Sequence, residues 1–472
     1  MSIYINSLSD IKQTFDVSKE DKLYYGEIYS PFSLINNIFN LFEDHVFTEP
    51  NKKWLDVGAG TGYFSIILFY RLDKGLTNVI PNETERKTHI IQNMIYMVEI
   101  KESNILELKK TFGEKSNIIH NDFINSVDMN YTNNKKNNTF DYIIGNPPYN
   151  SNGIKKVPTN NTVSKKNEGN TIWCKFIVKS LTLLKKNTGK MAVIIPSIWL
   201  KRDKEGMHNL LTYYKLEKIH CLNSNQTNVT FNGNAQTPTC FFILTKKQTD
   251  GIVSLHDINK KEYVLYNHTI GESIPLFGSY IINKLKKWIN MKDVGFLKVV
   301  KTNMPSVHSK FIENLYDPNY PYTNVKTCLL EKNTLQPTLT MNYSNIPQSF
   351  YGVKKIIMAH KMYGFPYYDS KGQYGISNRD NYVIIDKTDD EFKQLQKFLS
   401  SKLVLYIFES ARYRMRYLEK YAFEFIPDIT KIHTFPSFND LNENTINDFF
   451  ELDEQDRTHI NNLHKREYKM FI

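Results

Sequence analysis

Two short segments of the chain combine residue types that could do chemistry. The first is Asn146–Tyr149, an Asn-Pro-Pro-Tyr turn that follows the apolar run Tyr142–Gly145. A strand that ends in this turn brings a side-chain amide, backbone carbonyls and an aromatic ring together, and the prolines add no N–H donors. The oxygens would accept hydrogens from a planar amino group while the ring stacks on its flat face. We predict that this set is catalytic: Asn146, Pro147, Pro148 and Tyr149.

The second segment is the glycine-rich turn Asp56–Gly62, which lies about ninety residues upstream. It follows the short apolar strand Trp54–Val57 and precedes the apolar helix predicted for Tyr63–Leu72. Glycines permit tight backbone curvature and the close approach of a ligand. No Lys-Ser or Lys-Thr pair follows, so the turn does not fit a phosphate-binding P-loop. The strand, turn and helix together predict a cofactor loop.

Two acidic residues follow the next strands along the chain. Glu99 ends the strand predicted for 94–99, where an acid can accept hydrogen bonds from ribose hydroxyls. Asp122 and Phe123 follow the strand predicted for 117–120, where the acid could accept from an exocyclic amino group and the ring could pack on a purine. Each feature alone is also typical of an ordinary exposed strand end.

The elements that must position these residues alternate between strand and helix over some 200 residues. Further strands are predicted at 140–144, 191–196 and 240–244, with helices at 30–45, 104–112 and 172–184. Such alternation predicts an α/β fold with a mostly parallel, doubly wound sheet. Ligands bind such sheets at the carboxyl ends of the strands, which is where the cofactor loop, Glu99, Asp122 and Asn146 all lie.

The pattern changes at about residue 250, where turn residues, Tyr and Pro become frequent. We therefore predict a first domain at 1–250 and a second at 251–472. The clearest element of the second is a helix over 389–420, which ends with Arg412 and Arg416 on one face. Arginines with interleaved tyrosines suit contact with phosphates and bases. A surface helix end with snorkelling arginines explains the pattern equally well.

Composition and charge limit the class of protein and suggest its partner. The 472 residues are 41% hydrophobic and 23% charged, as in soluble globular proteins, and no apolar run approaches a membrane span. The N-terminus lacks a secretory signal and the four cysteines are widely spaced, so we expect an intracellular, cytoplasmic protein without a metal site. Residues 151–205 hold 12 Lys and Arg but only 3 Asp and Glu, a net +9 within a chain of +11. This charge next to the catalytic turn suggests a polyanionic substrate, although a solvated lysine-rich surface would look the same.

In this order and spacing, the motifs of residues 20–250 resemble the S-adenosylmethionine-dependent amino-group DNA methyltransferases, specifically the N6-adenine enzymes. The resemblance implies a Rossmann-like class I methyltransferase domain. Tyr25–Phe32 looks like the family's motif near the methionine end of the cofactor. Thr171–Phe176 looks like the helix motif that follows the catalytic motif in this family. The cofactor residues that the resemblance implies are Tyr29, Pro31, Asp56, Gly58, Gly60, Gly62, Glu99, Asp122, Phe123 and Asn146.

The resemblance also implies how the substrate is held. Tyr149 would stack on one face of a flipped-out adenine and Phe231 would lie near the other face. Lys155 and Lys156 would contact phosphates. Residues 251–472 would form an α+β target-recognition domain, with Arg412 and Arg416 as DNA contacts. One departure from the family pattern is a longer gap before the ribose acid, where Leu76–Arg86 looks like an insertion.

The function that we expect is therefore methyl transfer to the N6 amino group of adenine in double-stranded DNA. The sequence leaves open whether a separate restriction endonuclease is a partner. Three alternatives remain: methylation of adenine in RNA, methylation of a protein glutamine amide, and a non-enzymatic DNA-binding specificity subunit. Glutamine methyltransferases share the Asn-Pro-Pro-Tyr turn but are shorter. A degenerate subunit would have a damaged turn or loop, and both are intact here. Pro427–Lys431 only superficially resembles a nuclease signature, so we expect no DNA cleavage.

Overall fold

The computed structural model describes residues 18–126, 139–151, 170–203, 205–313, 316–330, 337–360, 366–414 and 418–463. The chain divides into two compact units. The first unit contains Met1–His256 and Leu265–Gly271, and the second contains Asp257–Val264 and Glu272–Ile472. Each unit is described by itself below.

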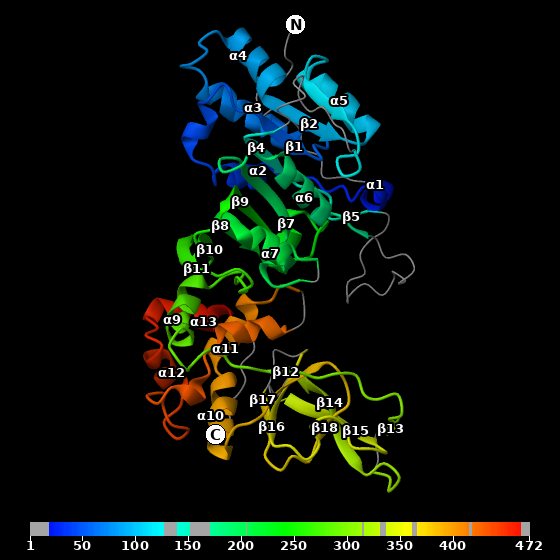
Figure 1. The fold of residues 1–472 in the computed structure, drawn as a ribbon, viewed down its shortest axis with the longest axis vertical. Coiled ribbons are helices and arrows are strands. Elements are labelled where there is room, and N and C mark those ends of the chain that lie inside the picture. Colours follow the sequence, from blue (N-terminus) through cyan, green and yellow to red (C-terminus); the bar gives the residue numbers. More distant parts are fainter. Residues whose placement is uncertain are drawn as a thin grey trace. The chain divides into compact units, whose positions relative to one another are not determined.

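The first unit is built on a nine-stranded sheet in the order β11-β10-β8-β9-β7-β4-β1-β2-β3 (Figure 1). Strand β9 is antiparallel to both of its neighbours, whereas the pairs from β7 through β4, β1 and β2 to β3 are parallel. The strands are β1 Trp54–Val57, β2 Ile95–Glu99, β3 Asn117–His120, β4 Tyr142–Gly145, β7 Lys190–Pro196, β8 Tyr214–Leu222, β9 Thr239–Gln248, β10 Ile252–Asp257 and β11 Glu262–Asn267.

Helices cover both faces of this sheet. Every residue of β1, β2 and β4 is therefore buried. The α-helices are α1 Lys19–Tyr24, α2 Phe32–Phe39, α3 Tyr63–Gly75, α4 Glu83–His89, α5 Glu102–Phe112, α6 Trp173–Leu183, α7 Met207–Tyr213 and α8 Ser224–Thr230. Short 3-10 helices lie at Asp44–Phe47 and Ser197–Leu200, a π-helix at Ile90–Met94, and a two-stranded ribbon joins β5 Asn150–Ser151 to β6 Asn170–Thr171.

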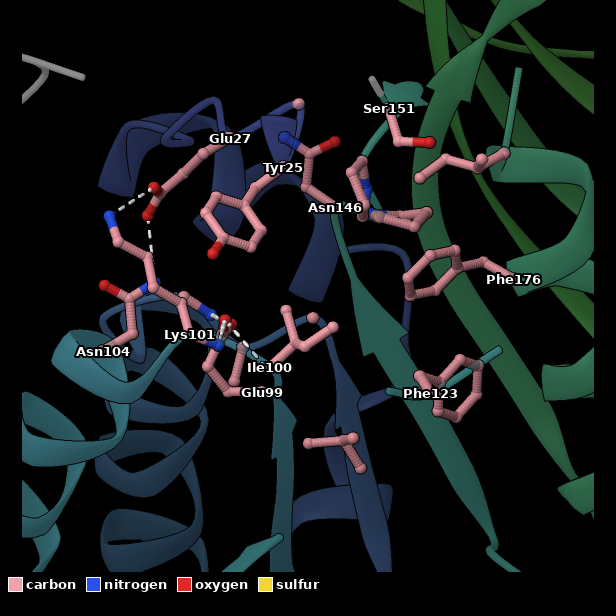
Figure 2. Close-up of a pocket in the computed structure, with 18 of the residues that line it drawn as sticks. Tyr25, Glu27, Glu99, Ile100, Lys101, Asn104, Phe123, Asn146, Ser151 and Phe176 are labelled. Atoms are coloured by element: carbon pink, nitrogen blue, oxygen red, sulfur yellow. Dashed lines mark hydrogen bonds and ion pairs between the residues drawn. The ribbon is translucent and has the colours of Figure 1, made fainter. Parts of the chain in front are cut away.

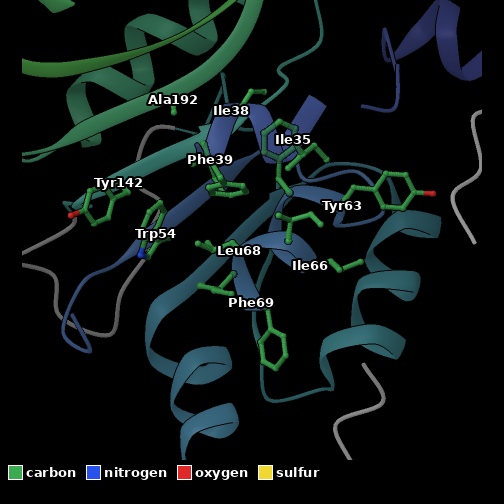
Figure 3. Close-up of a cluster of buried hydrophobic side chains, with 14 of the residues drawn as sticks. Ile35, Ile38, Phe39, Trp54, Tyr63, Ile66, Leu68, Phe69, Tyr142 and Ala192 are labelled. Carbon is green, nitrogen blue, oxygen red and sulfur yellow. The ribbon is translucent and has the colours of Figure 1, made fainter. Parts of the chain in front are cut away.

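The largest hydrophobic cluster fixes the first strand against its helices. Ile35, Ile38 and Phe39 of α2 are fully buried in this cluster, together with the apolar side of α3 (Figure 3). Burying side chains of this size contributes about 2 kcal/mol each. Trp54 of β1 stacks on Tyr142 of β4, with ring centroids 4.0 Å apart. The cluster therefore anchors the two strands that carry the predicted cofactor loop and catalytic turn.

The order of the strands places a ligand crevice between β1 and β4. From β1 the chain proceeds outward through β2 to β3, and then returns to the other side of β1 as β4. Such a reversal opens a crevice at the carboxyl ends of the two central strands. The glycine-rich turn follows β1 and the Asn-Pro-Pro-Tyr turn follows β4, so both turns lie at this crevice.

Most of the expected elements of this unit are present. The strands at Trp54–Val57 and Asn117–His120 have the expected bounds, and the mostly parallel, doubly wound sheet is confirmed. The expected insertion at 76–86 leads into helix α4 and the π-helix. Arg86 holds this segment against α3, because its guanidinium donates to Asp73 at 2.7 Å and to the carbonyl of Ile80 at 3.0 Å.

The second unit is α+β, as expected. One four-stranded sheet has the order β12-β19-β16-β17 and another has the order β13-β15-β14-β18. The strands are β12 Val300–Lys301, β13 Phe311–Ile312, β14 Tyr322–Leu330, β15 Pro337–Ser344, β16 Lys355–Ala359, β17 Pro366–Asp369, β18 Gly375–Ile376 and β19 Asn381–Ile384. The α-helices are α9 Ser279–Ile289, α10 Asp389–Leu399, α11 Lys402–Ser410, α12 Glu443–Phe449 and α13 Glu454–Leu463, and 3-10 helices lie at Lys420–Phe425 and Ile429–Lys431.

The single helix expected over 389–420 is wrong. The chain breaks after α10, and α11 begins anew with Ser401 as its N-cap, whose hydroxyl accepts from the backbone N–H of Val404 at 3.3 Å. Serine competes for backbone hydrogen bonds and so favours a cap over a helix interior. The apolar periodicity continues across the break and hides it. Among the described residues, no helix has the length and apolar character needed to cross a membrane.

Candidate active site

A cavity of about 640 Å³ lies at the carboxyl ends of the central strands of the first unit (Figure 2). Its walls come from the segment before α2, the loop after β1, the end of β2, the loop after β3, the turn after β4 and the start of α6. This volume is in the range of small-molecule sites. Of the predicted site residues, the cavity lining includes Tyr29, Gly58, Gly60, Glu99, Asp122, Phe123, Asn146, Pro147, Pro148 and Tyr149.

The side-chain amide of Asn146 has a defined orientation. Its nitrogen Nδ2 donates to the backbone carbonyl of Ile28 at 3.3 Å and to the hydroxyl Oγ of Ser30 at 3.1 Å. A carbonyl oxygen only accepts, so the amide nitrogen must be the end that faces Ile28. The amide oxygen Oδ1 therefore points the other way, and it is a buried acceptor with no partner among the described residues.

Three buried polar atoms of the cavity lining have no hydrogen-bond partner among the described residues: Thr61 Oγ1, Asn146 Oδ1 and the hydroxyl of Tyr149. A buried polar group without a partner costs about 1–3 kcal/mol, so folded proteins rarely leave one unpaired. Three such atoms around one cavity indicate a site built for a polar ligand. Burial raises the pKa of Tyr149, so its hydroxyl stays protonated and its ring stays neutral at physiological pH.

The cofactor loop and the end of β2 are joined through the carboxylate of Glu99. One oxygen accepts from the backbone N–H of Gly60 at 2.7 Å, and the other accepts from the N–H groups of Ile100 at 3.0 Å and Lys101 at 2.9 Å. Burial raises the pKa of Glu99, whereas these backbone hydrogen bonds lower it. A carboxylate has about four lone-pair positions, so this arrangement leaves room for a further donor from a ligand.

One wall of the cavity is aromatic. Phe123 stacks on Phe176 of α6, with ring centroids 5.2 Å apart and an interplanar angle of 22°. The preceding Asp122 forms a local turn, in which its carboxylate accepts from the backbone N–H groups of Ile124 at 2.8 Å and Asn125 at 3.1 Å. A flat ring system is the ligand shape that such a wall suits.

Comparison with known proteins shows which family of sequences the residues around this site resemble. Residues 19–227 match the model of the Eco57I restriction-modification methylase family. These residues, called the methylase segment here, make up less than half of the 472-residue chain. A Mycoplasma pneumoniae protein described as an uncharacterized adenine-specific methylase is 26% identical, over 42% of this chain and 61% of that relative. The chain thus matches less than two thirds of the length of that relative.

Solved structures of restriction-modification proteins are also similar, but only weakly. The M protein of the type I restriction enzyme EcoKI gives a TM-score of 0.35 at 17% identity, over 49% of this chain and 48% of that one. A methyltransferase subunit of a type I restriction-modification system from Streptococcus thermophilus gives a TM-score of 0.33 at 19% identity, and the match covers 50% of each chain. We base no conclusion on TM-scores of this size. The resemblance expected from the motifs is confirmed by the family match, and the Rossmann-like fold of the methylase segment is confirmed by its sheet.

Three residues predicted to bind the cofactor lie beside the cavity of the methylase segment and do not line it: Pro31, Asp56 and Gly62. Asp56 is buried below the loop, where it accepts from the hydroxyl of Ser65 at 2.7 Å. Gly62 has a φ of +90°, and a side chain there would meet Leu108 of α5 at 2.7 Å. Asp56 and Gly62 therefore support the conformation of the loop and do not line the cavity.

Sequence reasoning missed a polar cluster at the mouth of the cavity. The carboxylate of Glu27 accepts from the hydroxyl of Tyr29 at 2.7 Å, from the ammonium of Lys101 at 3.1 Å and from the amide of Asn104 at 3.0 Å (Figure 2). Asp21 pairs with the same ammonium at 2.9 Å. The only available signal was an acid inside the motif Tyr25–Phe32, because its partners lie more than seventy residues away.

The structure does not bring Phe231 to the cavity of the methylase segment. Its side chain is 1% exposed in the hydrophobic core, just beyond α8. A ring packed this way has no face free to stack on a base, so the placement of a second stacking aromatic at Phe231 does not agree with the structure. The surrounding Asn and Gly residues form the end of a helix, and the apolar ring packs inward because burial is favourable there.

The remaining predicted substrate contacts are basic. Lys155, Lys156 and Arg416 lie outside the described residues. Arg412 lies in the second unit, where its guanidinium forms an ion pair with Glu409 and its side chain is 21% exposed. Burial raises the pKa of Glu409 and the charge of Arg412 lowers it, so this arginine has a structural role in addition to any contact with DNA.

Proposed function

We propose that this protein transfers a methyl group from S-adenosylmethionine to the N6 amino group of a flipped-out adenine in duplex DNA. The observation that supports it most is the orientation of the Asn146 amide. Its nitrogen is paired and its oxygen has no partner among the described residues, in a turn that lines the cavity and lies within the segment matching a methylase family. An exocyclic amino nitrogen of this kind is a poor nucleophile because its lone pair is delocalised into the aromatic ring. Acceptors for both of its hydrogens would counter that delocalisation.

The residues present fit S-adenosylmethionine. Glu99 would accept from ribose hydroxyls, Phe123 with Phe176 would hold the adenine ring, and the loop Gly58–Gly60 would lie against the ligand. The methionine end would approach Tyr29. When bound, this cofactor supplies an electrophilic methyl group on a sulfonium.

The chain's own groups would act by positioning. Oδ1 of Asn146 would accept one hydrogen of the amino group and the carbonyl of Pro147 the other, which would move the nitrogen toward tetrahedral geometry. The ring of Tyr149 would stack on the base. Such preorganised acceptors typically contribute about 10²–10³-fold in rate per group. A base inside a duplex cannot reach a cavity of this depth, so it would have to be flipped out.

We further propose that the second unit recognises the DNA target and that residues 151–205 contact phosphates. Duplex DNA is the expected partner, and a separate restriction endonuclease would act on the same site. We propose no cleavage activity for this chain itself. DNA nicking by the pure protein in magnesium would contradict that part of the proposal.

The test is transfer of a labelled methyl group from S-adenosylmethionine to mixed-sequence duplex DNA, followed by nucleoside analysis. We expect N6-methyladenine with the parent protein and a loss of at least about 10²-fold with Asn146→Ala. Asn209→Ala, at an exposed position of α7, is the matched control and should retain parental activity.

Other outcomes would separate the alternatives. Label in RNA or in a protein glutamine, but not in DNA, would contradict the proposed substrate and keep the amino-group chemistry. Cofactor binding without transfer to any of these acceptors would support a non-enzymatic specificity subunit.

A further inference from the structure

Asn146 is held by two acceptors on one short segment of the chain. Ile28 and Ser30 lie in the stretch that leads into α2, more than a hundred positions before Asn146 in sequence. Each of the two hydrogens on Nδ2 has its own acceptor, the carbonyl of Ile28 at 3.3 Å and Oγ of Ser30 at 3.1 Å. Ser30 is 4% exposed, so water does not readily replace its hydroxyl.

The two ends of a primary amide have nearly the same shape and opposite hydrogen-bonding character. If the Asn146 amide turned over, its oxygen would face the carbonyl of Ile28, and its NH₂ group would take the place of the unpaired oxygen. An NH₂ group there would repel the hydrogens of an incoming amino group instead of accepting them. Productive binding therefore requires that one of the two orientations be strongly preferred.

We propose that Ser30 is a positioning residue, which holds the side chain of Asn146 in place while the carbonyl of Ile28 determines which end of the amide is its nitrogen. This inference rests on the proposed function, because the orientation matters for a substrate that donates hydrogens. Ser30 acts through Asn146 and need not touch the substrate. The carbonyl of Ile28 accepts one hydrogen, and Oγ of Ser30 satisfies the second, so the loss of Ser30 would leave one buried amide hydrogen unpaired.

The segment that carries Ser30 is itself fixed on two sides. Glu27 ties it to the start of α5 through Lys101 and Asn104. On the other side Gly26 has a φ of +66°, and a side chain there would collide with the backbone oxygen of Asn150. The chain thus passes tightly against the residue that follows the catalytic turn, which holds Ser30 at a fixed distance from Asn146.

The experiment compares Ser30→Ala and Ser30→Thr with the parent in steady-state methyl transfer to DNA. A hydrogen bond of this kind contributes about 0.5–1.5 kcal/mol, so we expect Ser30→Ala to lower kcat by up to about tenfold. The KM for DNA and the Kd for S-adenosylmethionine should stay at parental values, because Ser30 acts on orientation. Ser30→Thr keeps the oxygen and should restore most of kcat.

Ser197→Ala is the matched control, because Ser197 is also fully buried and donates to the carbonyl of Pro238 at 3.0 Å outside the cavity lining. It should affect stability without lowering kcat. A parental kcat for Ser30→Ala, or equal losses of kcat in both serine variants, would overturn the proposal. Weaker cofactor binding with parental kcat in Ser30→Ala would assign the hydroxyl to the cofactor instead.

A second measurement does not depend on activity. In protein labelled with ¹⁵N-asparagine, the side-chain NH₂ signals of Asn146 are assigned by their absence in Asn146→Ala. We expect faster solvent exchange of these hydrogens in Ser30→Ala than in the parent, and unchanged exchange would overturn the proposal. If the parent transfers no methyl group to DNA, the proposed function fails, while this measurement still tests the orientation of the amide.

Discussion

At the scale of single residues, the choice of an amide at position 146 follows from its two unlike ends. The nitrogen satisfies the backbone carbonyl of Ile28 and the hydroxyl of Ser30, and the oxygen is left for a ligand. A carboxylate has the same shape, but both of its ends accept hydrogen bonds. One of its oxygens would therefore lie against the carbonyl of Ile28, and two acceptors in contact repel each other.

We expect Asn146→Asp to lose methyl transfer by about 10²-fold or more at pH 8, although its shape is conserved. A buried carboxylate facing a carbonyl takes up a proton more readily than one in water, and its O–H could then donate to Ile28. The rate of the variant relative to the parent should therefore recover as the pH falls from 8 toward 6. Rates of labelled methyl transfer over this range measure the effect, and a constant ratio would contradict it.

At the scale of elements, the unit formed by β1, the glycine-rich turn and α3 encloses a carboxyl group. Asp56 is the residue before the last in β1, and its carboxylate accepts from the hydroxyl of Ser65 on α3. Burial, with a smaller contribution from the nearby charge of Glu99, raises the pKa of Asp56 to about 7. The hydrogen bonds from Ser65 lower this pKa but do not offset the effect of burial. The native turn therefore binds a proton that the unfolded chain releases.

This proton gives a pH dependence with a defined sign. Between the ordinary pKa of 3.8 and about 7, the native state holds more protons than the unfolded state, so the free energy of unfolding falls as the pH rises. The contribution of Asp56 is at most about 4 kcal/mol over this window. We expect Asp56→Asn to flatten the decrease between pH 5 and pH 8, measured by urea unfolding. Equal decreases in parent and variant would contradict the assignment.

At the scale of the whole molecule, the charge is unevenly distributed along the chain. The net charge is +11, and residues 151–205, next to the catalytic turn, carry +9 of it. Several lysines of the first unit already pair with carboxylates, such as Lys110 with Glu107 at 2.6 Å and Lys215 with Asp250 at 2.6 Å. Removing a paired lysine should affect a polyanion less than removing a lysine of the predicted phosphate contacts.

We expect Lys155→Ala combined with Lys156→Ala to weaken DNA binding for every sequence and to reduce the slope of log K against log salt by about 2. With each phosphate contact that is lost, DNA binding releases fewer counterions. Titrations of duplex DNA between about 50 and 200 mM salt measure this slope. The double variant Lys110→Ala and Lys215→Ala removes the same charge outside residues 151–205 and serves as the control. Equal changes in slope would show that only net charge matters.

The sequence by itself determined the elements and motifs that depend on contiguous residues. Strands such as Trp54–Val57 are predictable because four buried residues in a row are typical of a strand covered on both faces. The doubly wound sheet followed from the alternation of strands and helices, and the polar residues at the strand ends followed from the same pattern. The family resemblance rested on these short motifs, and the match over residues 19–227 confirms it.

Only the tertiary structure decided how distant segments meet. It set Ser30 and Ile28 against Asn146, joined Glu27 to Lys101 and Asn104, and buried Phe231 in the core. Periodicity and propensity describe neighbours along the chain, whereas these contacts depend on the path of the backbone over a hundred positions. The sequence could therefore place an amide at the end of β4, but only the fold could show which end of that amide is paired and which end has no partner among the described residues.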